Sequence, residues 1–492
     1  MYSPRVLALI AAGACAALVP TASSSLVSAQ AARRALARGT STDLNGFLSA
    51  VLLFGAADAN KDNAVTREEL RAALDRIFTA ADTGGTGAVA SDTLVPALNT
   101  AMPMSALATA MNMGGGGAQP QTPEPQSVQA MMAALPATAP AKPAQPRKVL
   151  VLARAGGFVH SSIPLAAKTI EALGAKTGAW TTTISYDAND INADNLKSYD
   201  AVFLASTTGA FLDDPANAAA TEARRKALLD FVRGGKGLAG IHAATDSYHA
   251  SGADARGAGP GRGAAAANPL GSFSAGKALA PLMIRDGDRN GNQRLDRAEV
   301  AGLADAWFDA LDTRRTDRLT QPDFALFALL VPKAPSQVPQ GPDDEVGTWP
   351  DFNRLIGGYF KFHWLDPQQV TVKVDDAASP LTAMFKGAPL VVHDEIYTMA
   401  ANSWSRENVH VLTSIDYAKM SAEDRALEEH PRADHDFGLS WIRREGQGRV
   451  FYEALGHSER IYAMRPILEH LLAGIQYALG DLKADDSPST RR

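Results

Sequence analysis

The stretch Lys148-Val149-Leu150-Val151-Leu152 decides the fold class of this chain. A short, continuous apolar run of this kind is expected of a parallel strand that is buried on both faces of a sheet. Further along, the sequence predicts strands over 181–184, 201–204 and 237–241, with helices over 164–173 and 221–232 between them. Strands that alternate with helices predict an α/β fold with a doubly wound, mostly parallel sheet.

The α/β pattern stops near residue 249 and resumes near residue 347. Residues 250–346 form helical segments flanked by stretches rich in Gly, Ala and Pro. Strands are then predicted over 370–374, 409–412 and 449–452, and a last amphipathic helix over 466–479. Because surface turns tolerate insertions, we predict one α/β domain in two parts, 147–249 and 347–482, with 250–346 as an insert.

Composition limits the classes of protein that remain. The 492 residues are 46% hydrophobic and 20% charged, with a net charge of −6. A chain of this length and apolar content can bury several cores, which excludes a fully disordered, collagenous or polytopic membrane protein. No basic patch stands out, so nucleic acid is not an expected partner.

The first 29 residues have the features of a secretory signal peptide. One positive charge precedes the apolar run 6–19, and Val27-Ser28-Ala29 is typical of a cleavage site. This predicts a periplasmic or secreted protein with no membrane span after signal cleavage. The alternative is a lipoprotein anchored through Cys15, although Ala12-Gly13-Ala14 lacks the large apolar residue that usually precedes the lipidated cysteine. Because Cys15 is the only cysteine, the mature chain has no disulfide, zinc–thiolate site or cysteine nucleophile.

Two segments precede the α/β domain. Residues 41–100 are predicted to form a pair of helix–loop–helix units. Residues 101–146 are rich in Met, Gly, Pro, Ala and Gln, with four consecutive glycines at 114–117. This composition is typical of a disordered linker.

Two 12-residue loops, 58–69 and 288–299, carry oxygen-bearing side chains at positions 1, 3, 5, 9 and 12. This spacing supplies the six to eight oxygens that Ca²⁺ prefers, with the last glutamate bidentate. Position 6 normally takes Gly for its left-handed backbone, and here it holds Asn63 and Gln293. The candidate calcium ligands are Asp58, Asn60, Asp62, Thr66 and Glu69 in the first loop, and Asp288, Asn290, Asn292, Asp296 and Glu299 in the second.

Each of these loops is followed by a degenerate copy, over 82–93 and 312–323. Position 12 is Thr93 in one copy and Asp323 in the other, which should weaken calcium binding severely. The arrangement resembles two EF-hand pairs, one at 41–100 and one in the insert, each with one competent site. We expect calcium to stabilise these helices rather than to act as a signal.

Polar side chains gather where the strands of the α/β domain should end. His160 follows the strand at 148–152, His242 follows the strand at 237–241, and His457 follows the strand at 449–452. Glu395 lies in the acidic stretch 393–397. Because ligands of open α/β sheets bind at the carboxyl ends of strands, we expect these four side chains to meet. Asp246 is a weaker candidate, and the other histidines are expected to be structural.

The ordered set of these segments resembles the ThuA-like, or trehalose-utilisation, family. The matching pieces are 157–162, 240–246, 349–352, 355–360, 394–397, 448–452 and 454–457. The resemblance implies a class I glutamine-amidotransferase-like fold with a flavodoxin-like sheet, and a role in carbohydrate metabolism. The calcium-binding insert departs from the simple family pattern. His242 takes a place comparable to the cysteine of the amidotransferases, so a Cys-dependent glutaminase is excluded.

Two kinds of chemistry suit His160, His242, Glu395 and His457. They can serve as general acid and base near neutral pH, or they can coordinate a divalent transition metal such as zinc with an open position for substrate. We expect a calcium-binding protein that acts on a small carbohydrate or an oxidised sugar derivative. The rival interpretation is a non-catalytic, calcium-stabilised carbohydrate-binding module.

Overall fold

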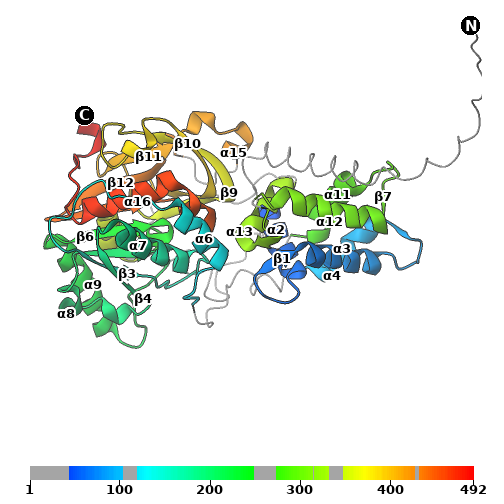
Figure 1. The fold of residues 1–492 in the computed structure, drawn as a ribbon, viewed down its shortest axis with the longest axis horizontal. Helices are drawn as coiled ribbons and strands as arrows, with labels where there is room; N and C mark the ends of the chain where they lie inside the picture. The colour runs from blue at the N-terminus through cyan, green and yellow to red at the C-terminus, as the bar shows by residue number, and fades with distance from the viewer. Residues whose placement is uncertain are drawn as a thin grey trace, which may run out of the picture.

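A computed structural model describes residues 44–103, 119–248, 273–313, 315–331, 347–426 and 432–491. The predicted signal peptide, Cys15 and residues 104–118 of the predicted linker lie outside these residues. In Figure 1 the α/β part and a helical part lie side by side along the long axis of the molecule. Each part has its own cluster of buried apolar side chains. None of the helices within the described ranges is long and apolar enough to cross a membrane.

The α/β part is built on one nine-stranded sheet with the strand order β10-β9-β11-β12-β13-β6-β5-β3-β4. Five neighbouring strands, from β13 to β4, are parallel. The other four pair antiparallel, so the sheet is mixed rather than mostly parallel throughout. Its strands are β3 (Lys148–Leu152), β4 (Thr181–Ser185), β5 (Ala201–Ala205), β6 (Gly237–Ile241), β9 (Phe360–Val374), β10 (Leu390–Met399), β11 (His410–Ile415), β12 (Gly438–Glu445) and β13 (Gly448–Glu453).

Helices cover both faces of the parallel strands. α16 packs against β13 and β6 and also contacts α7, whereas α14 approaches β6 at Gly240. Gly237 meets the last turn of α16 and Gly240 meets Ile356 of α14, and residues three apart on a strand point to opposite faces. The helices of this part are α6 (Pro125–Ala134), α7 (Ile163–Thr177), α8 (Ala193–Leu196), α9 (Ala218–Arg233), α14 (Pro350–Ile356), α15 (Ala422–Ala426) and α16 (Arg465–Ala478).

The predicted linker differs from the structure over 119–146. Residues 125–134 form α6, and Met131 and Leu135 are buried in the core of the α/β part. Gln119 also accepts a hydrogen bond from the Ala155 backbone at 3.0 Å. This segment is ordered because a few apolar residues and hydrogen bonds attach it to the rest of the α/β part, which its composition does not reveal.

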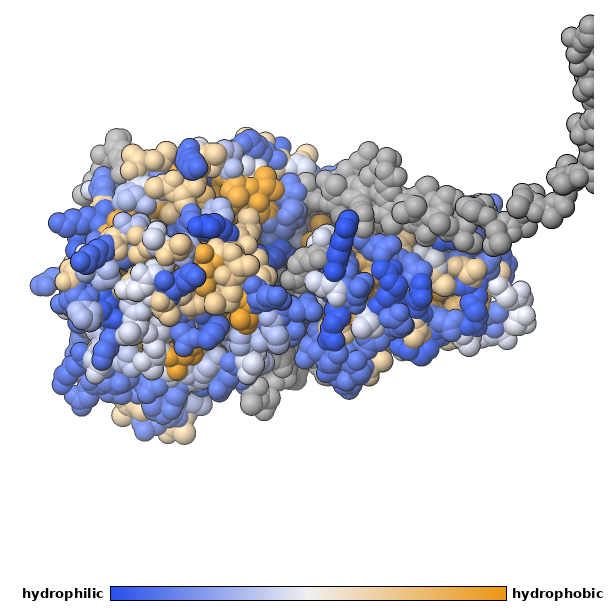
Figure 2. Space-filling view, in the orientation of Figure 1, coloured by the Kyte–Doolittle hydropathy of each residue, from blue (hydrophilic) through white to orange (hydrophobic). Residues whose placement is uncertain are grey.

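The helical part combines the N-terminal segment with the insert, which share one apolar core. α11 packs against α4, and α12 packs against α3 (Figure 1). On the face drawn in Figure 2 its surface is mostly hydrophilic. We call this part the helical unit. Its elements are α2 (Leu44–Ala57), β1 (Ala64–Thr66), α3 (Arg67–Ala81), β2 (Ala88–Ala90), α4 (Ser91–Ala101), α11 (Ala275–Gly287), β7 (Arg294–Asp296), α12 (Arg297–Leu311), β8 (Arg318–Thr320), α13 (Gln321–Ala325) and η4 (Leu326–Leu330).

The loops of the helical unit pair in a different way from the prediction. β1 pairs with β8 and β2 pairs with β7, so each N-terminal loop joins a loop of the insert. The prediction assumed that each loop pairs with the next loop in its own segment. The apolar core that the two segments share instead places each loop beside a loop of the other segment. The insert is therefore not a separate body.

Candidate functional site

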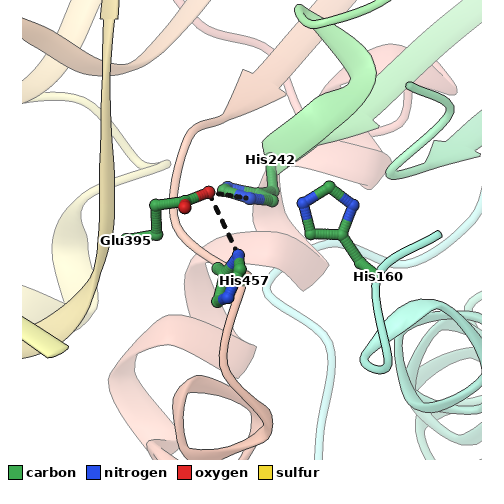
Figure 3. Close-up of side chains that lie close together, drawn as sticks. All are labelled: His160, His242, Glu395 and His457. Atoms are coloured by element: carbon green, nitrogen blue, oxygen red, sulfur yellow. Dashed lines mark ion pairs between the residues drawn. The ribbon is translucent and has the colours of Figure 1, made fainter. Parts of the chain in front are cut away.

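The structure brings His160, His242, Glu395 and His457 together (Figure 3). One ligand atom from each of them lies within 4.8 Å of the others. His160, His242 and His457 follow β3, β6 and β13, which are all parallel strands that end at the same edge of the sheet. Glu395 enters from β10 on the other side of the group (Figure 3). The four residues are thus assembled by tertiary contacts between distant segments.

Two glycines position the loop that carries His160. Gly156 forms a parallel bridge with Gly209, and its amide donates to the Thr208 carbonyl at 2.6 Å. A Cβ on Gly156 would lie 2.5 Å from the backbone of Ala210. The two loops can therefore touch only without a side chain there, and the contact places Nδ1 of His160 3.4 Å from the Thr208 hydroxyl.

His242 is held by its own backbone and by its neighbours. Its φ of +46° is left-handed, a conformation that costs free energy for a residue with a side chain. Nδ1 of His242 donates to the Ala454 carbonyl at 3.0 Å, and the backbone carbonyl of His242 accepts from the Tyr452 hydroxyl at 2.6 Å. A proton on Nδ1 leaves a lone pair on Nε2, which is the tautomer that a metal requires.

A β-bulge explains how Glu395 reaches the site. The pairing of β10 with β9 shifts between Asp394 and Ile396, so the alternation of faces is broken there. Both Asp394 and Glu395 are buried. Asp394 accepts hydrogen bonds from the backbone amides of residues 456, 457 and 458, at 2.6, 3.3 and 2.8 Å. Its carboxylate thereby fixes the loop that presents His457.

The nitrogens at the centre of the group lack hydrogen-bond partners. Oε2 of Glu395 lies 3.3 Å from Nε2 of His242 and 3.1 Å from Nδ1 of His457, the pairs drawn dashed in Figure 3. Both nitrogens are buried, and neither makes a hydrogen bond of acceptable geometry. Buried polar atoms are normally satisfied, so unsatisfied nitrogens around a carboxylate fit a cation that would lie between them.

The electrostatics of the group agree with this interpretation. Burial lowers the pKa of His160 well below its usual value, helped by His242 and His457, so its imidazole is neutral. Burial opposes ionisation of Glu395, but the neighbouring His363 and His457 together with the contact from His242 lower its pKa well below the usual range. The Glu395 carboxylate raises the pKa of His457 to about 10 against the effect of burial. In the absence of a metal, a proton on His457 balances the charge of Glu395.

Sequence reasoning missed His363, which was expected to be structural. Its Nδ1 lies 3.1 Å from Oε1 of Glu395, and it pairs with Tyr397 across β9 and β10. Only the strand pairing reveals this, because no motif surrounds His363. Among the others, His410 binds Asp376 and the Ser487 carbonyl, and His470 binds the Leu381 carbonyl, which suits structural roles. His249 and His430 lie outside the described residues.

The two predicted calcium loops are surface loops of the helical unit. Asn63 and Gln293, at position 6, have φ of +61° and +60°, so the left-handed backbone expected there is present. Asp58 and Asp288, at position 1, accept hydrogen bonds from the backbone amides at positions 5 and 6. At position 12, Glu69 and Glu299 accept from the backbone at the start of their own helices.

A family model described as "ThuA: Trehalose utilisation" matches residues 148–279 and 340–478, more than half of the chain. No curated protein matches. Similar solved structures include a ThuA-like protein of Bacteroides uniformis (16% identity, 70% of this chain and 96% of that one, TM-score 0.38). A ThuA-like protein of Parabacteroides merdae is 15% identical over 69% and 93% of the two chains, with a TM-score of 0.35. A β-galactosidase of Bacillus circulans sp. alkalophilus is 8% identical over 74% and 34%, with a TM-score of 0.30. The family assignment rests on the sequence match: the chain belongs to the ThuA family.

Proposed function

We propose that the protein is an exported enzyme that uses a divalent transition metal such as zinc to act on a carbohydrate or an oxidised sugar derivative. The observation that carries this proposal is the convergence of His160, His242, Glu395 and His457 around buried nitrogens with no hydrogen-bond partner. The family match supports a carbohydrate as the substrate class.

The donor set suits zinc. Three imidazoles and one carboxylate are ligands that Zn²⁺ accepts, and a catalytic site keeps a position open for water or substrate. The Ala454 carbonyl and the backbone amides around Asp394 hold His242 and His457 in place, as ligand-orienting groups do in zinc proteins. When bound, the metal would supply a Lewis acid for a sugar oxygen. His363 would remain next to Glu395, positioned to exchange a proton or to orient the carboxylate.

We further propose that the loops 58–69 and 288–299 are EF-hand calcium sites. Their left-handed residues at position 6 and the amides turned towards the first aspartate support this proposal. Oε1 of Glu299 already accepts from the Arg289 amide and the Asn290 side chain within its loop, at 3.0 and 3.1 Å, whereas calcium would require Glu69 to turn from its helix start towards the loop. The expected role is structural, because each loop pairs with a loop of the other segment. The signal peptide makes the periplasm or the exterior the proposed location.

Elemental analysis of the purified full chain, dialysed against zinc and calcium, tests the metal centre. We expect one zinc per chain in the wild type and less than a tenth of that in His242→Ala. His435→Ala is the matched control, because His435 is exposed and stacks on Tyr417. Equal zinc in all three proteins would contradict the proposed ligands.

Activity is then screened on disaccharides and keto-sugars with the zinc-loaded protein. An enzyme loses turnover in His242→Ala and keeps it in His435→Ala. If the wild type binds a sugar without turning any over, the non-catalytic binding module is the correct interpretation.

A further inference from the structure

A pocket lies where the helical unit meets the α/β part, and His457 is one of its lining residues. Its empty space is about 520 Å³, open solvent included, so it is a shallow and open site rather than an enclosed cavity. α2 and η4 of the helical unit both contact β9 of the sheet at this junction. The pocket is therefore bounded by both parts of the protein and adjoins the candidate metal centre.

The two sides of the pocket differ in chemistry. The α/β side carries oxygen atoms, from Ser161, Asp366, Ser458 and Glu459. Several of these groups are already fixed, since Ser161 donates to Glu459 at 2.8 Å and Asp366 pairs with Arg460 at 2.5 Å. Hydroxyl groups of a sugar would find partners on this side.

The helical side is apolar and comes from two segments of the chain. Phe47, Val51 and Phe54 belong to α2, and Phe324 and Ala325 belong to α13. Phe47, Val51 and Ala325 are only partly buried, so they keep apolar surface that a ligand can cover. We call these five residues the apolar wall.

The apolar wall is held together by the crosswise pairing of the helical unit. β1 follows α2 and pairs with β8, which leads directly into α13. Phe54 and Phe324 also contact each other edge to face, with ring centroids 5.6 Å apart. Both α2 and α13 lie outside the residues that the family model matches. The wall therefore lies outside the segments that the family model matches, and it faces the polar pocket residues next to His457.

We infer that the apolar wall forms half of the substrate pocket of the metal centre and selects glycosides with an apolar face beside the reacting group. That face is the C–H side of a second sugar ring or an aryl aglycone, which aromatic side chains bind well. This inference rests on the proposed function, because it needs a substrate that reaches the metal.

Two hydroxamates test the wall without knowledge of the substrate. Both chelate zinc, but benzohydroxamate carries a phenyl ring and acetohydroxamate carries only a methyl group. Their affinities for the zinc-loaded, calcium-saturated full chain are measured by calorimetry. The ratio of the two affinities reports the contribution of the pocket beyond the metal.

We expect Phe47→Ala to lower the ratio about tenfold, because apolar surface that covers the phenyl ring is lost. Ala325→Leu should exclude benzohydroxamate and leave acetohydroxamate bound. Leu326→Ala is the matched control, since Leu326 packs against the same core but does not line the pocket. Zinc content and acetohydroxamate affinity should be unchanged in all three variants, which also shows that they fold.

The outcomes separate the two proposals. An unchanged ratio in both Phe47→Ala and Ala325→Leu, with zinc still bound, would overturn the apolar wall and leave the metal centre standing. A wild type that binds no zinc would overturn both.

Discussion

Replacement of Asp394 by Asn should destabilise the protein and weaken the proposed metal site, although Asp394 is not among the proposed ligands. Its carboxylate accepts three backbone hydrogen bonds from the loop that carries His457. Burial raises the pKa of Asp394 to about 6, so the group is ionised at pH 7.5. The asparagine side chain keeps one acceptor oxygen, and its NH₂ group would face a backbone N–H that is also a donor. At least one buried N–H is then unpaired, and the charge is lost from the others.

The expected cost follows from these contacts. A charge-assisted hydrogen bond contributes about 1.5–3 kcal/mol, so the loss of one bond and the weakening of two give about 3 kcal/mol. Loss of a group that orients a metal ligand typically lowers affinity about 10- to 100-fold. Urea unfolding of metal-free protein at pH 7.5 measures the first effect, and zinc titration against a competing chelator measures the second.

Asp194→Asn is the control, because Asp194 is exposed and pairs with the exposed Lys197. No measurable change is expected there in either assay, because solvent screens a pair between exposed side chains. If Asp394→Asn behaves like Asp194→Asn in both assays, the view that Asp394 holds the His457 loop is refuted.

Three further predictions concern the rest of the molecule. Glu69→Gln together with Glu299→Gln should abolish the calorimetric heat of calcium binding, and an unchanged heat would show that the ligands are misassigned. Gly276→Ala should lower the free energy of unfolding by about 1–3 kcal/mol, because its Cβ would lie 2.2 Å from the Val95 carbonyl oxygen of α4. Gly302→Ala should cost much less, since the atoms nearest its Cβ belong to the end of the flexible Arg289 side chain, which can move aside; equal losses would argue against tight contact between the two segments. His470 has its pKa lowered by burial to about 4 from 6.5. The unfolded chain therefore binds the proton first, and His470 should withdraw about 3 kcal/mol of stability as pH falls from 7.5 to 4. His470→Gln should show a correspondingly flatter stability profile in urea unfolding, and an unchanged slope would contradict this.

Local sequence predicted the parallel half of the sheet well. The strands at 148–152 and 237–241 are continuous apolar runs, and burial on both faces demands that pattern. The antiparallel strands β10 and β12 were not predicted. β10 contains His393, Asp394 and Glu395 in its middle, so its composition does not show the alternation of a half-buried strand.

The candidate site also contains residues that local sequence predicted and residues that depend on strand pairing. His160, His242 and His457 were predicted to meet because each follows a parallel strand, and parallel strands end at one edge. Glu395 joined the set through the family resemblance and its acidic neighbours. The bulge that turns it inward, and the approach of His363 from β9, depend on a strand pairing that no local pattern encodes.

The sequence by itself determined the periodic elements, the left-handed loop positions and which side chains stand at strand ends, because these depend on a few neighbouring residues. Only the tertiary structure decided three features. These are the pairing of each N-terminal loop with a loop of the insert, the formation of a helix at 125–134, and the contact between the helical unit and the α/β part at the pocket. Those features depend on contacts between apolar surfaces that lie far apart in the chain. Apolar surfaces of similar size can pack in many ways, so only the complete core determines which of them meet.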